Sequence, residues 1–562
     1  MKKEIIRKYA LQNAIKFNGK ANPGAIIGKL ISEDPKLKSK LKEISKDIQA
    51  VVKEVNKISV EDQISELKKI APELLEEKKK VKEKGLSELK NVKGKVIMRL
   101  APSPSGPMHL GHAYPLSLNS EYCRNYNGKL ILRIEDTNPE NIYEPAYALL
   151  PEDAKWVTKN NISEVIIQSD RMGSYYDYAE KLVDMGKAYV CECDSDKWRT
   201  LIFERKACSC RDLSAEKQHE RYNKMFSSYK PGEAVLRLKT DIDHKNPAMR
   251  DFPLMRINEH VHPRKGTEFR VWPLMNFAVF VDDVESGMTH IIRAKDHADN
   301  AKRQEYLYKY FKKPVPETMF VGKINFEDLR LSASETKKLI EEGKYTGWDD
   351  IRLPFLLALK RRGYQPDAFI KYALDVGVSQ ADKTVSKEEF FKSLNHFNKE
   401  VLDPISDRYF FVDNPKEITV EGAPSQEVSL DLHPDHPKKG KRKFKTGEKF
   451  YISAEDLKGF KAGELIRLMD CLNFVKKGNK FVFDSAEYAK FKENGSKIIH
   501  WLPVSDLIKV DLLMPDKSLR KGLAEKDISK LKEGDICQFE REGFVRLDKK
   551  LKNKLVFWYG HR

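Results

Sequence analysis

The sequence predicts a multidomain chain built around an α/β domain with a parallel sheet. Its 562 residues are too many for one hydrophobic core. From residue 95 onward, apolar runs of strand length alternate with amphipathic helical patterns, and beyond residue 401 strand and turn signals dominate. We therefore expect a helical N-terminal domain, a central α/β domain and a β-rich C-terminal region.

Residues 1–94 are rich in lysine and glutamate, with apolar residues at helical spacing, as at Ile44, Ile48 and Val55. Glycines and prolines divide this pattern into a few helices. The run of charges from Glu76 to Lys84 is most simply a solvated helix face, and a direct contact with RNA is the alternative. Residues 1–94 are thus predicted to be a helical domain.

The α/β pattern begins with three strand-like runs, VIMRL, KLILRIED and SEVIIQSD, accompanied by helical segments such as residues 176–185. Alternation of this kind predicts a parallel sheet with crossover helices. The pattern stops after Tyr189 and returns with VWPLMNFAVFVDD and MTHIIRAKD, which indicates an insertion. We expect the two halves of one domain at residues 95–188 and 263–330, separated by an insertion at 189–262.

Two further regions complete the predicted organisation. Residues 331–400 return to helical patterning after the small, polar loop LRLSASE. Residues 401–562 carry runs such as RYFFV, KEITV and LVFWYG, which predict one long or two small β-barrels. The basic run KKGKRKFK at 438–445 suits phosphate contact and base stacking, and an exposed turn with solubilising lysines is the alternative.

The charge balance and the apolar pattern limit the class of protein. Lysine and arginine number 103 against 85 aspartate and glutamate, a formal net charge of +18. This excess suits a polyanionic partner, although it also serves solubility. No stretch approaches the ~20 apolar residues of a membrane span, and the first residues lack the apolar core of a signal peptide. We expect a cytoplasmic protein that does not enter a membrane.

The stretch RLAPSPSGPMHLGH, from Arg99 to His112, is the first candidate site. An apolar strand leads into a turn rich in proline and glycine, and helical spacing resumes with His109 and His112 in the first turn. Unpaired N–H groups and the positive end of the helix dipole attract phosphate oxygens there. Gly111 would leave room for a flat ring against the backbone. A surface helix that happens to contain two histidines is the alternative.

Four of the seven cysteines form the second candidate site. Cys191 and Cys193 are followed by Cys208 and Cys210, and a sparse, odd cysteine count in a chain without a signal peptide argues for reduced thiols. Four thiolates suit tetrahedral zinc, and such a site would be structural because it leaves no open position. A reduced cluster without metal is the alternative.

Several stretches taken together carry a family resemblance. They are RLAPSPSGPMHLGH with RIEDTNPE, GKANPGAIIGKL, GEAVLRLKTDIDHKNPAMRD, VWPLMNFAVFVDD, THIIRAKDH and HPDHPKKGKRKF. They resemble the glutamyl-tRNA synthetases, a class I family, and in particular their archaeal branch. The resemblance implies a Rossmann-type catalytic domain, a zinc-bearing acceptor-stem insertion at 189–262, a stem-contact domain at 331–400 and anticodon-binding barrels at 401–562. It also implies attachment of L-glutamate to tRNA(Glu), and also to tRNA(Gln), through a glutamyl-adenylate formed from ATP with Mg²⁺.

The resemblance assigns roles to residues at matching positions. Implied in catalysis are His109, His112, Arg330, Ser332 and Ser334. Implied in ATP binding are Pro107, His109, Gly111, His112, Lys323, Leu331 and Ser332. Implied in glutamate binding are Arg99, Ser103, Glu135, Met275 and Arg293, and the basic run supplies the candidate tRNA contacts Lys441, Arg442 and Lys443. Guanidinium suits a side-chain carboxylate and Glu135 suits an ammonium; a strand-end carboxylate paired with a neighbouring arginine is the alternative for Glu135.

Two positions depart from the family pattern. Met275 stands where a tyrosine is usual and cannot donate a hydrogen bond to substrate. Asn276 or a water is expected to replace the hydroxyl, or the pocket depends more on its arginines. Ala333 stands where the mobile loop usually carries a lysine, and the candidates to replace that cation are Lys323, Lys337 and Lys338.

Three alternatives stay open. A glutaminyl-tRNA synthetase is disfavoured by Arg293, because a cation beside a neutral amide would be left unpaired. A small-molecule nucleotidylyltransferase also uses H-x-G-H on an α/β fold, but it would need neither the insertion nor the basic tail. An RNA-binding regulator descended from a synthetase would account for Met275 and Ala333.

Overall fold

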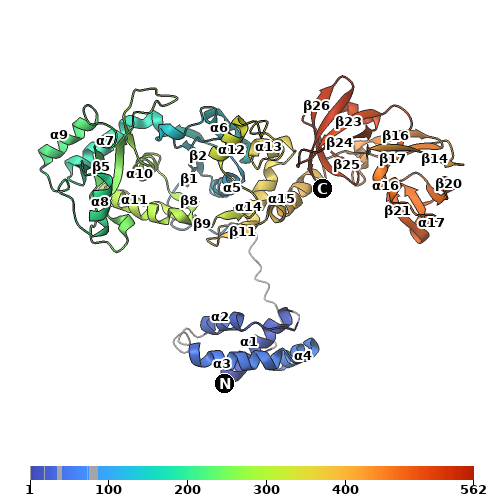
Figure 1. The fold of residues 1–562 in the computed structure, drawn as a ribbon, viewed down its shortest axis with the longest axis horizontal. Helices are drawn as coiled ribbons and strands as arrows, with labels where there is room; N and C mark the ends of the chain where they lie inside the picture. The colour runs from blue at the N-terminus through green and yellow to red at the C-terminus, as the bar shows by residue number, and fades with distance from the viewer. Residues whose placement is uncertain (1, 18, 34–40, 72–73, 75–85) are drawn as a thin grey trace. The chain divides into compact units, whose positions relative to one another are not determined.

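The computed structural model of the chain describes residues 2–17, 19–33, 41–71, 74 and 86–562, in two compact units, Met1–Lys84 and Gly85–Arg562 (Figure 1). The charge run from Glu76 to Lys84 lies outside the described residues. The boundary falls before residue 94 because Leu89 is buried in the core of the second unit. Among the described residues, every helix is too short or too polar to span a bilayer.

The first unit is a small helical bundle. Its helices are α1 (Lys2–Lys16), α2 (Pro23–Glu33), α3 (Leu41–Val55) and α4 (Val60–Ile70). Ile48 and Val55 of α3 share a core with Leu67 of α4, so the helical spacing in the sequence marks the buried face. The Ser59 hydroxyl caps α4 by accepting a hydrogen bond from the Asp62 N–H at 3.1 Å. The predicted helical character is confirmed.

The second unit begins with a parallel sheet. β1 (Ile97–Leu100), β2 (Lys129–Ile134) and β3 (Glu164–Ile167) pair in that order. β8 (His290–Ala294) and β9 (Glu317–Val321) form a second parallel pair. The Thr289 N–H donates to the Ile97 carbonyl at 3.1 Å, so β8 begins beside β1.

Helices cover this sheet and continue beyond it. They are α5 (Leu110–Asn125), α6 (Ala146–Val157), α7 (Met172–Asp184), α10 (Met275–Glu285), α11 (Ala298–Tyr310), α12 (Ala333–Glu341), α13 (Leu356–Arg361), α14 (Pro366–Val376) and α15 (Lys387–Leu402). The short strands β10 (Ile324–Phe326) and β11 (Lys383–Val385) pair in parallel between them. Leu116 and Tyr122 of α5 share one core with Leu130 and Leu132 of β2, which fixes the start of α5 at the end of the sheet.

The insertion is an antiparallel sheet with its own helices. Its elements are β4 (Ala188–Cys191), α8 (Ser195–Phe203), α9 (Ala215–Met225), β5 (Val235–Leu238), β6 (Phe252–Ile257) and β7 (Val271–Pro273), with strand order β4-β5-β6-β7. The apolar run VWPLMNFAVFVDD, expected to resume the α/β pattern, divides into β7, which ends the antiparallel sheet, and the helix α10. A continuous apolar run does not distinguish a strand from a buried helix, and Phe277 and Phe280 are fully buried on α10.

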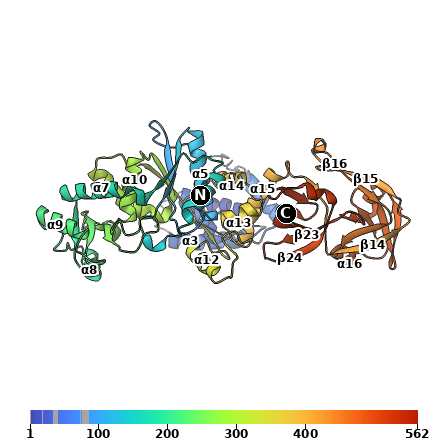
Figure 2. The ribbon, with the colours of Figure 1, turned by 90° about the horizontal axis from the view of Figure 1, so that it is seen from above.

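The C-terminal region holds two seven-stranded sheets and one hairpin (Figure 2). Strand orders are β12-β25-β26-β27-β23-β24-β13 and β21-β18-β19-β20-β14-β17-β22, and β15 pairs with β16. The bounds are β12 (Arg408–Tyr409), β13 (Phe411–Asp413), β14 (Pro415–Glu421), β15 (Gln426–Asp431), β16 (Lys441–Thr446), β17 (Lys449–Ser453), α16 (Ala454–Lys458), β18 (Leu465–Leu468), β19 (Asn473–Lys477), β20 (Lys480–Ser485), α17 (Tyr488–Asn494), β21 (Gly495–Ile499), β22 (Leu502–Pro503), β23 (Ile508–Leu513), β24 (Leu519–Ala524), β25 (Ile536–Phe539), β26 (Gly543–Leu551) and β27 (Lys554–His561). Each sheet has its own apolar core, so the structure favours two small barrel-like bodies over one long barrel.

Arginines of α13 and its C-cap attach this region to the catalytic part. Arg361 donates two hydrogen bonds of 2.7 Å to the Asp548 carboxylate of β26. Arg362 donates to the Gly560 carbonyl of β27 at 2.7 Å. A paired guanidinium–carboxylate fork of this kind fixes an orientation as well as a contact.

Candidate active site

A cavity of about 580 Å³ opens at the carboxyl ends of β1, β2, β8 and β9. This volume is typical of ligand pockets, which span about 300–1,000 Å³. The predicted residues that line it are Arg99, His109, Gly111, His112, Glu135, Met275, Arg293, Lys323 and Leu331. Segments that are far apart in the sequence thus bring the candidate nucleotide and glutamate residues to one space.

Two histidines of this cavity stand at the start of α5. His109 is the N-cap, and its Nδ1 accepts a hydrogen bond from the Gly111 N–H at 3.0 Å. The Nδ1 of His112 accepts from the His109 N–H at 3.3 Å. Because each Nδ1 accepts, each neutral ring carries its proton on Nε2. The two rings, whose centroids are 4.0 Å apart, therefore offer two N–H donors side by side.

Burial keeps both imidazoles neutral at physiological pH. Burial, and secondarily the charge of His112, lower the pKa of His109 well below its ordinary value. Burial also lowers the pKa of His112 to about 4. The site therefore offers oriented neutral donors rather than cations, and such donors stabilise developing negative charge without reorganisation.

Gly111 is required by His109. A Cβ at this position would lie 2.9 Å from Cε1 and 3.0 Å from Nδ1 of the His109 ring. Any side chain would push the imidazole out of its capping position. The expectation that Gly111 leaves room for a flat ligand ring stays a prediction, because its backbone lines the cavity while an added side chain would meet the His109 ring.

A buried carboxylate holds Arg99. The Nε of Arg99 donates to Oδ1 of Asp283 at 2.8 Å, and Nη1 of Arg133 donates to the same oxygen at 2.6 Å. Burial alone would raise the pKa of Asp283, but the two guanidinium charges outweigh it and lower the pKa to about 2. Glu135 accepts from Arg133 at 3.2 Å and also lines the cavity. Glu135 therefore pairs with a neighbouring arginine, as its alternative interpretation proposed, and is also accessible to a ligand in the cavity.

Arg293 differs, because no carboxylate of the described residues forms an ion pair with it. Its Nη1 donates to Oε1 of Gln304 at 3.1 Å. Burial, and then the charge of Arg99, lower the pKa of Arg293 to about 10. Asp283 and Glu135 act on this guanidinium only from a distance, and a largely desolvated guanidinium without an ion pair among the described residues favours an anionic ligand in the cavity.

Met275 is the first residue of α10 and lines the cavity, with 38% of its surface exposed. Asn276 does not replace the missing hydroxyl, because its amide is bonded to Gln304 and Asn300. Of the two compensations that this chain could supply, the structure thus favours dependence on the arginines.

The loop before α12 approaches the cavity through Leu331. Ser332 is the N-cap of α12, and its hydroxyl accepts from the Glu335 N–H at 3.3 Å. The side chain of Arg330 is 84% exposed and pairs with Glu335, and Ser334 is also exposed. Of the predicted loop residues, only Leu331 lines the cavity.

Ala333 lies against the turn that precedes α5. A Cβ on Gly106 would lie 3.0 Å from Cβ of Ala333 and 3.0 Å from the Trp348 ring. The loop and the turn therefore meet through two of the smallest residue types. Close contact at this point explains how alanine fits where a lysine is usual.

Of the three lysines proposed to replace that cation, only Lys323 lines the cavity. Its ammonium lies 2.7 Å from the Asp296 carboxylate. Lys337 and Lys338 face glutamates of α12 and its C-cap at 3.9 Å. Lys323 is therefore the candidate cation for a leaving phosphate.

Ser103 and Pro107, two further predicted site residues, do not line the cavity. Ser103 is exposed and Pro107 is buried. Their turn is fixed by two carbonyls: that of Pro102 accepts from the Glu135 N–H at 2.9 Å, and that of Pro104 accepts from the Tyr143 N–H at 2.8 Å.

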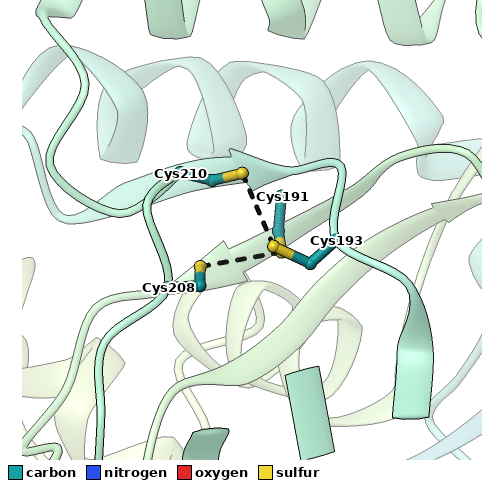
Figure 3. Close-up of side chains that lie close together, drawn as sticks. All are labelled: Cys191, Cys193, Cys208 and Cys210. Carbon is teal, nitrogen blue, oxygen red and sulfur yellow. Dashed lines mark hydrogen bonds between the residues drawn. The ribbon is translucent and has the colours of Figure 1, made fainter. Parts of the chain in front are cut away.

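The four cysteines of the insertion point toward one another (Figure 3). Their sulfurs all lie within 4.8 Å of one another, with 3.9 Å between Cys191 and Cys208 and 3.8 Å between Cys193 and Cys210. Four thiolates about 2.3 Å from one tetrahedral zinc ion would be roughly 3.8 Å apart. The donor set and its spacing therefore fit such an ion.

Two further contacts fix this cluster. Gln218 of α9 accepts from the Val190 N–H at 2.8 Å and donates to the Cys210 carbonyl at 2.7 Å, so it ties both cysteine-bearing segments together.

Burial and the neighbouring Cys208 raise the pKa of Cys193 to about 11. Thiolates packed in this way need a cation nearby to ionise together.

The basic hairpin places its residues alternately on two faces. Lys441 and Lys443 of β16 have side chains that are 57% and 65% exposed, whereas Arg442 is 3% exposed. Arg442 pairs with the buried Glu525, so it is not available to a phosphate, and that predicted tRNA contact is corrected. Phe444 is also buried, which excludes it from base stacking. Strand periodicity decides both outcomes, because alternate residues face the core.

Sequence reasoning missed four residues of the cavity region: Asp283, Arg133, Gln304 and His297. The pair Asp282–Asp283 did carry a signal, because two carboxylates inside an apolar helical run need buried partners. Gln304 lines the cavity from α11, and His297 lines it from the short helical turn before α11. Each is an isolated polar residue in the sequence, so no comparable pattern marked it.

The fold and this site define a class of protein. A parallel sheet leads into a helix that begins with H-x-G-H, an inserted domain interrupts that sheet, and barrel-like sheets follow. These are the features of a class I aminoacyl-tRNA synthetase.

Comparison with known families identifies the group within that class. The catalytic domain of "tRNA synthetases class I (E and Q)" matches residues 95–404, and two anti-codon binding domains of the same group match 406–489 and 498–548. The chain is 45% identical over 561 residues to a protein of Methanobrevibacter smithii named glutamate–tRNA ligase, covering 100% of this chain and 99% of that one. Proteins of the same name from Methanocaldococcus jannaschii (45%, 100% of both chains) and Pyrococcus abyssi (46%, 99% of both chains) are also similar. The chain therefore belongs to the glutamate–tRNA ligase family, which confirms the resemblance.

Proposed function

We propose that the chain attaches L-glutamate to tRNA(Glu) in two steps: formation of a glutamyl-adenylate from ATP, then transfer of the acyl group to the terminal adenosine. The observation that carries this proposal is Arg293, a desolvated cation that forms no ion pair with the carboxylates described in the structure, in the same cavity as two neutral histidine donors. An amino acid with a negatively charged side chain would bind to the guanidinium, and the phosphates of a nucleotide would accept hydrogen bonds from the histidines.

In the first step, the glutamate α-carboxylate attacks the α-phosphorus of ATP and pyrophosphate leaves. His109 and His112 would donate from Nε2 to phosphate oxygens as charge develops. Lys323 is the cation available to the leaving group, and Mg²⁺ supplies further charge neutralisation when bound with ATP. No covalent nucleophile is needed, because the protein's task is orientation and charge stabilisation.

Arginine chemistry would select glutamate over glutamine. Arg293 would bind the side-chain carboxylate, with the remaining donors of Arg99 beside it, and Glu135 would accept from the ammonium. A glutamine amide would leave Arg293 without a counter-charge, and that cost rejects the neutral substrate.

Recognition of tRNA would use the C-terminal sheets and the insertion. Lys441 and Lys443, on the exposed face of the hairpin, remain candidates for phosphate contact. We also propose that tRNA(Gln) is charged with glutamate, as expected for the archaeal branch that the sequence resembles. Charging assays with purified tRNA(Glu) and tRNA(Gln) test both statements. Glutamine outcompeting glutamate in pyrophosphate exchange with tRNA present would overturn the assignment.

We further propose that Cys191, Cys193, Cys208 and Cys210 hold a structural zinc ion. The spacing of the sulfurs supports this, and four protein ligands leave no position for chemistry. Metal analysis of the purified protein should give one zinc per chain, lost on substitution of Cys208 by serine. A protein without stoichiometric metal, equally stable with and without a chelator, would favour the metal-free cluster.

A further inference from the structure

A chain of side-chain hydrogen bonds joins three residues that line the cavity. Arg293 donates to Oε1 of Gln304 at 3.1 Å, and Nε2 of Gln304 donates to Oδ1 of Asn276 at 3.3 Å. Nδ2 of Asn276 donates to Oδ1 of Asn300 at 3.1 Å, and Nδ2 of Asn300 lies 3.1 Å from Nδ1 of His297. Arg293, Gln304 and His297 line the cavity, whereas Asn276 and Asn300 lie outside its lining.

The direction of every bond in this chain is fixed from both sides. Guanidinium groups only donate, so Gln304 must turn its oxygen toward Arg293. Arg303 also only donates, and its Nη1 donates to Oδ1 of Asn300 at 3.3 Å. Asn300 must therefore turn its oxygen toward Arg303. Asn276 stands between them, and its amide has an oxygen for one neighbour and N–H groups for the other. No amide can be reversed without placing two donors or two acceptors face to face.

This polarity selects one tautomer of the neutral His297 ring. The amide nitrogen of Asn300 faces Nδ1, so Nδ1 must accept and the neutral ring carries its proton on Nε2. The ring therefore offers one N–H to the cavity. The chain links α10 to α11, so it also resists movement of Gln304, which is 3% exposed and directly holds Arg293.

We propose that Asn276 is a positioning residue for glutamate binding: it holds Gln304, and thereby Arg293, in the orientation that meets the side-chain carboxylate, while Asn300 holds His297 as an Nε2–H donor. This inference rests on the proposed function, because the anion at Arg293 is taken to be glutamate. Asn276 itself touches no substrate and acts through its neighbours. Glutamate binding, rather than ATP binding, should therefore depend on it.

Replacement by an apolar residue of similar size tests this role. Asn276→Leu should raise the KM for glutamate by about tenfold, the scale of losing two hydrogen bonds, with the KM for ATP within about twofold of wild type. Asn246→Leu is the matched control, because Asn246 also bonds to α11, through Asp299 at 3.2 Å, but stands outside the chain. Equal rises for both substrates, or an equal effect of the control, would overturn the proposal.

A double-mutant cycle separates a linked chain from independent contacts. Gln304→Leu cuts the same path one step nearer Arg293, so the double variant should be no worse than the more impaired single variant. If the increases in KM of the two single variants multiply in the double variant, the two residues act independently and the proposed linkage is wrong. Because Gln304 lies on α11, the single variant Gln304→Leu remains informative if substitution on α10 prevents folding: it should raise the KM for glutamate while the KM for ATP stays within about twofold of wild type.

Nitrogen-15 spectra of wild-type protein give a measurement that requires no active variant. His297, assigned by its absence in His297→Gln, should be protonated on Nε2 and not on Nδ1, and Asn300→Leu should release a mixture of tautomers. A wild-type ring protonated on Nδ1 would overturn the inference. Absence of glutamyl-tRNA formation by wild type would instead overturn the proposed function, so the two failures are distinguishable.

Discussion

The sequence predicts an anion-binding arginine in each of two regions of the chain, the catalytic cavity and the basic hairpin. Both arginines are buried or partly buried, but their partners differ. In the catalytic cavity, Arg293 bonds to the neutral Gln304 and lies beside another cation, Arg99. At the junction of the barrel-like sheets, Arg442 bonds to Glu525, lies 3.6 Å from Glu540 and stacks 4.4 Å from the Phe410 ring centroid. Arg442 forms ion pairs within the protein, whereas no carboxylate of the described residues forms an ion pair with Arg293.

The difference teaches how to tell a binding arginine from a structural one. Burying a guanidinium is costly unless an anion accompanies it, so the anion must come either from the protein or from a ligand. Arg99 stands between the two cases, since Asp283 occupies part of its fork while the remainder faces the cavity. The counter-charge, rather than the residue type, decides the role.

Removing the uncompensated cation should have the largest effect on activity. Arg293→Gln keeps hydrogen-bonding capacity but loses the charge that meets the side-chain carboxylate, so kcat/KM for glutamate should fall by roughly 10³-fold, the scale of losing a desolvated charge pair. Steady-state aminoacylation measures this. The preference of this variant for glutamate over glutamine, measured as the ratio of the two kcat/KM values, should fall by a smaller factor than kcat/KM for glutamate itself. A change below tenfold would remove Arg293 from the site.

The matching change at the compensated arginine should affect stability and leave catalysis intact. Arg442→Met leaves Glu525 buried without its partner, which should lower the free energy of local unfolding by about 3 kcal/mol. Hydrogen exchange of β16 and β24 measures this. Adding Glu525→Leu should recover part of the loss, because an apolar pair needs no counter-charge. Unchanged exchange in the single variant would show that the pair contributes nothing to the junction.

Truncating one histidine donor tests the other half of the cavity. His112→Ala should lower turnover by roughly 10²-fold, as expected for a donor to a transition state, with little change in tRNA affinity. Pyrophosphate exchange and filter binding on the same preparation separate the two quantities. A wild-type rate would refute the assignment of His112.

The pH dependence checks the protonation that the cavity imposes. Burial lowers the pKa of His112 to about 4, below its unfolded value of about 6.5, so the folded state binds fewer protons between these values. Its contribution to stability is therefore complete above pH 6.5 and is lost as the pH falls toward 4. Titration of the ring by NMR should show no change between pH 6 and 8. A transition near 6.5 would contradict a buried neutral donor.

The smallest effect is expected at the exposed lysines of the hairpin. Lys443 lies 2.9 Å from Glu427 and is well solvated, so Lys443→Gln should reduce the salt dependence of tRNA binding by less than one unit of slope. Lys449→Gln is the matched control, because Lys449 of β17 has the same kind of exposed glutamate partner, Glu417 of β14. Equal slopes for both variants and wild type would leave Lys443 a solubilising residue.

The sequence by itself determined the order of domains, the helical N-terminal unit, the β-rich C-terminal region and the family. These features depend on local periodicity and on motifs such as H-x-G-H and the paired C-x-C segments, and local rules carry them. The same local rules did not separate β7 from α10, because an apolar run has the same letters in a buried strand and a buried helix.

Only the tertiary structure decided which polar groups have partners. Asp283 and Arg99 are far apart in the sequence, as are Arg442 and Glu525, and nothing local announces either pairing. Gly111 was expected to leave room for a ligand, and the structure adds that a side chain at this position would displace the ring of His109. Counter-charges and close contacts arise between distant segments, so the division between binding and structural residues is made by the fold.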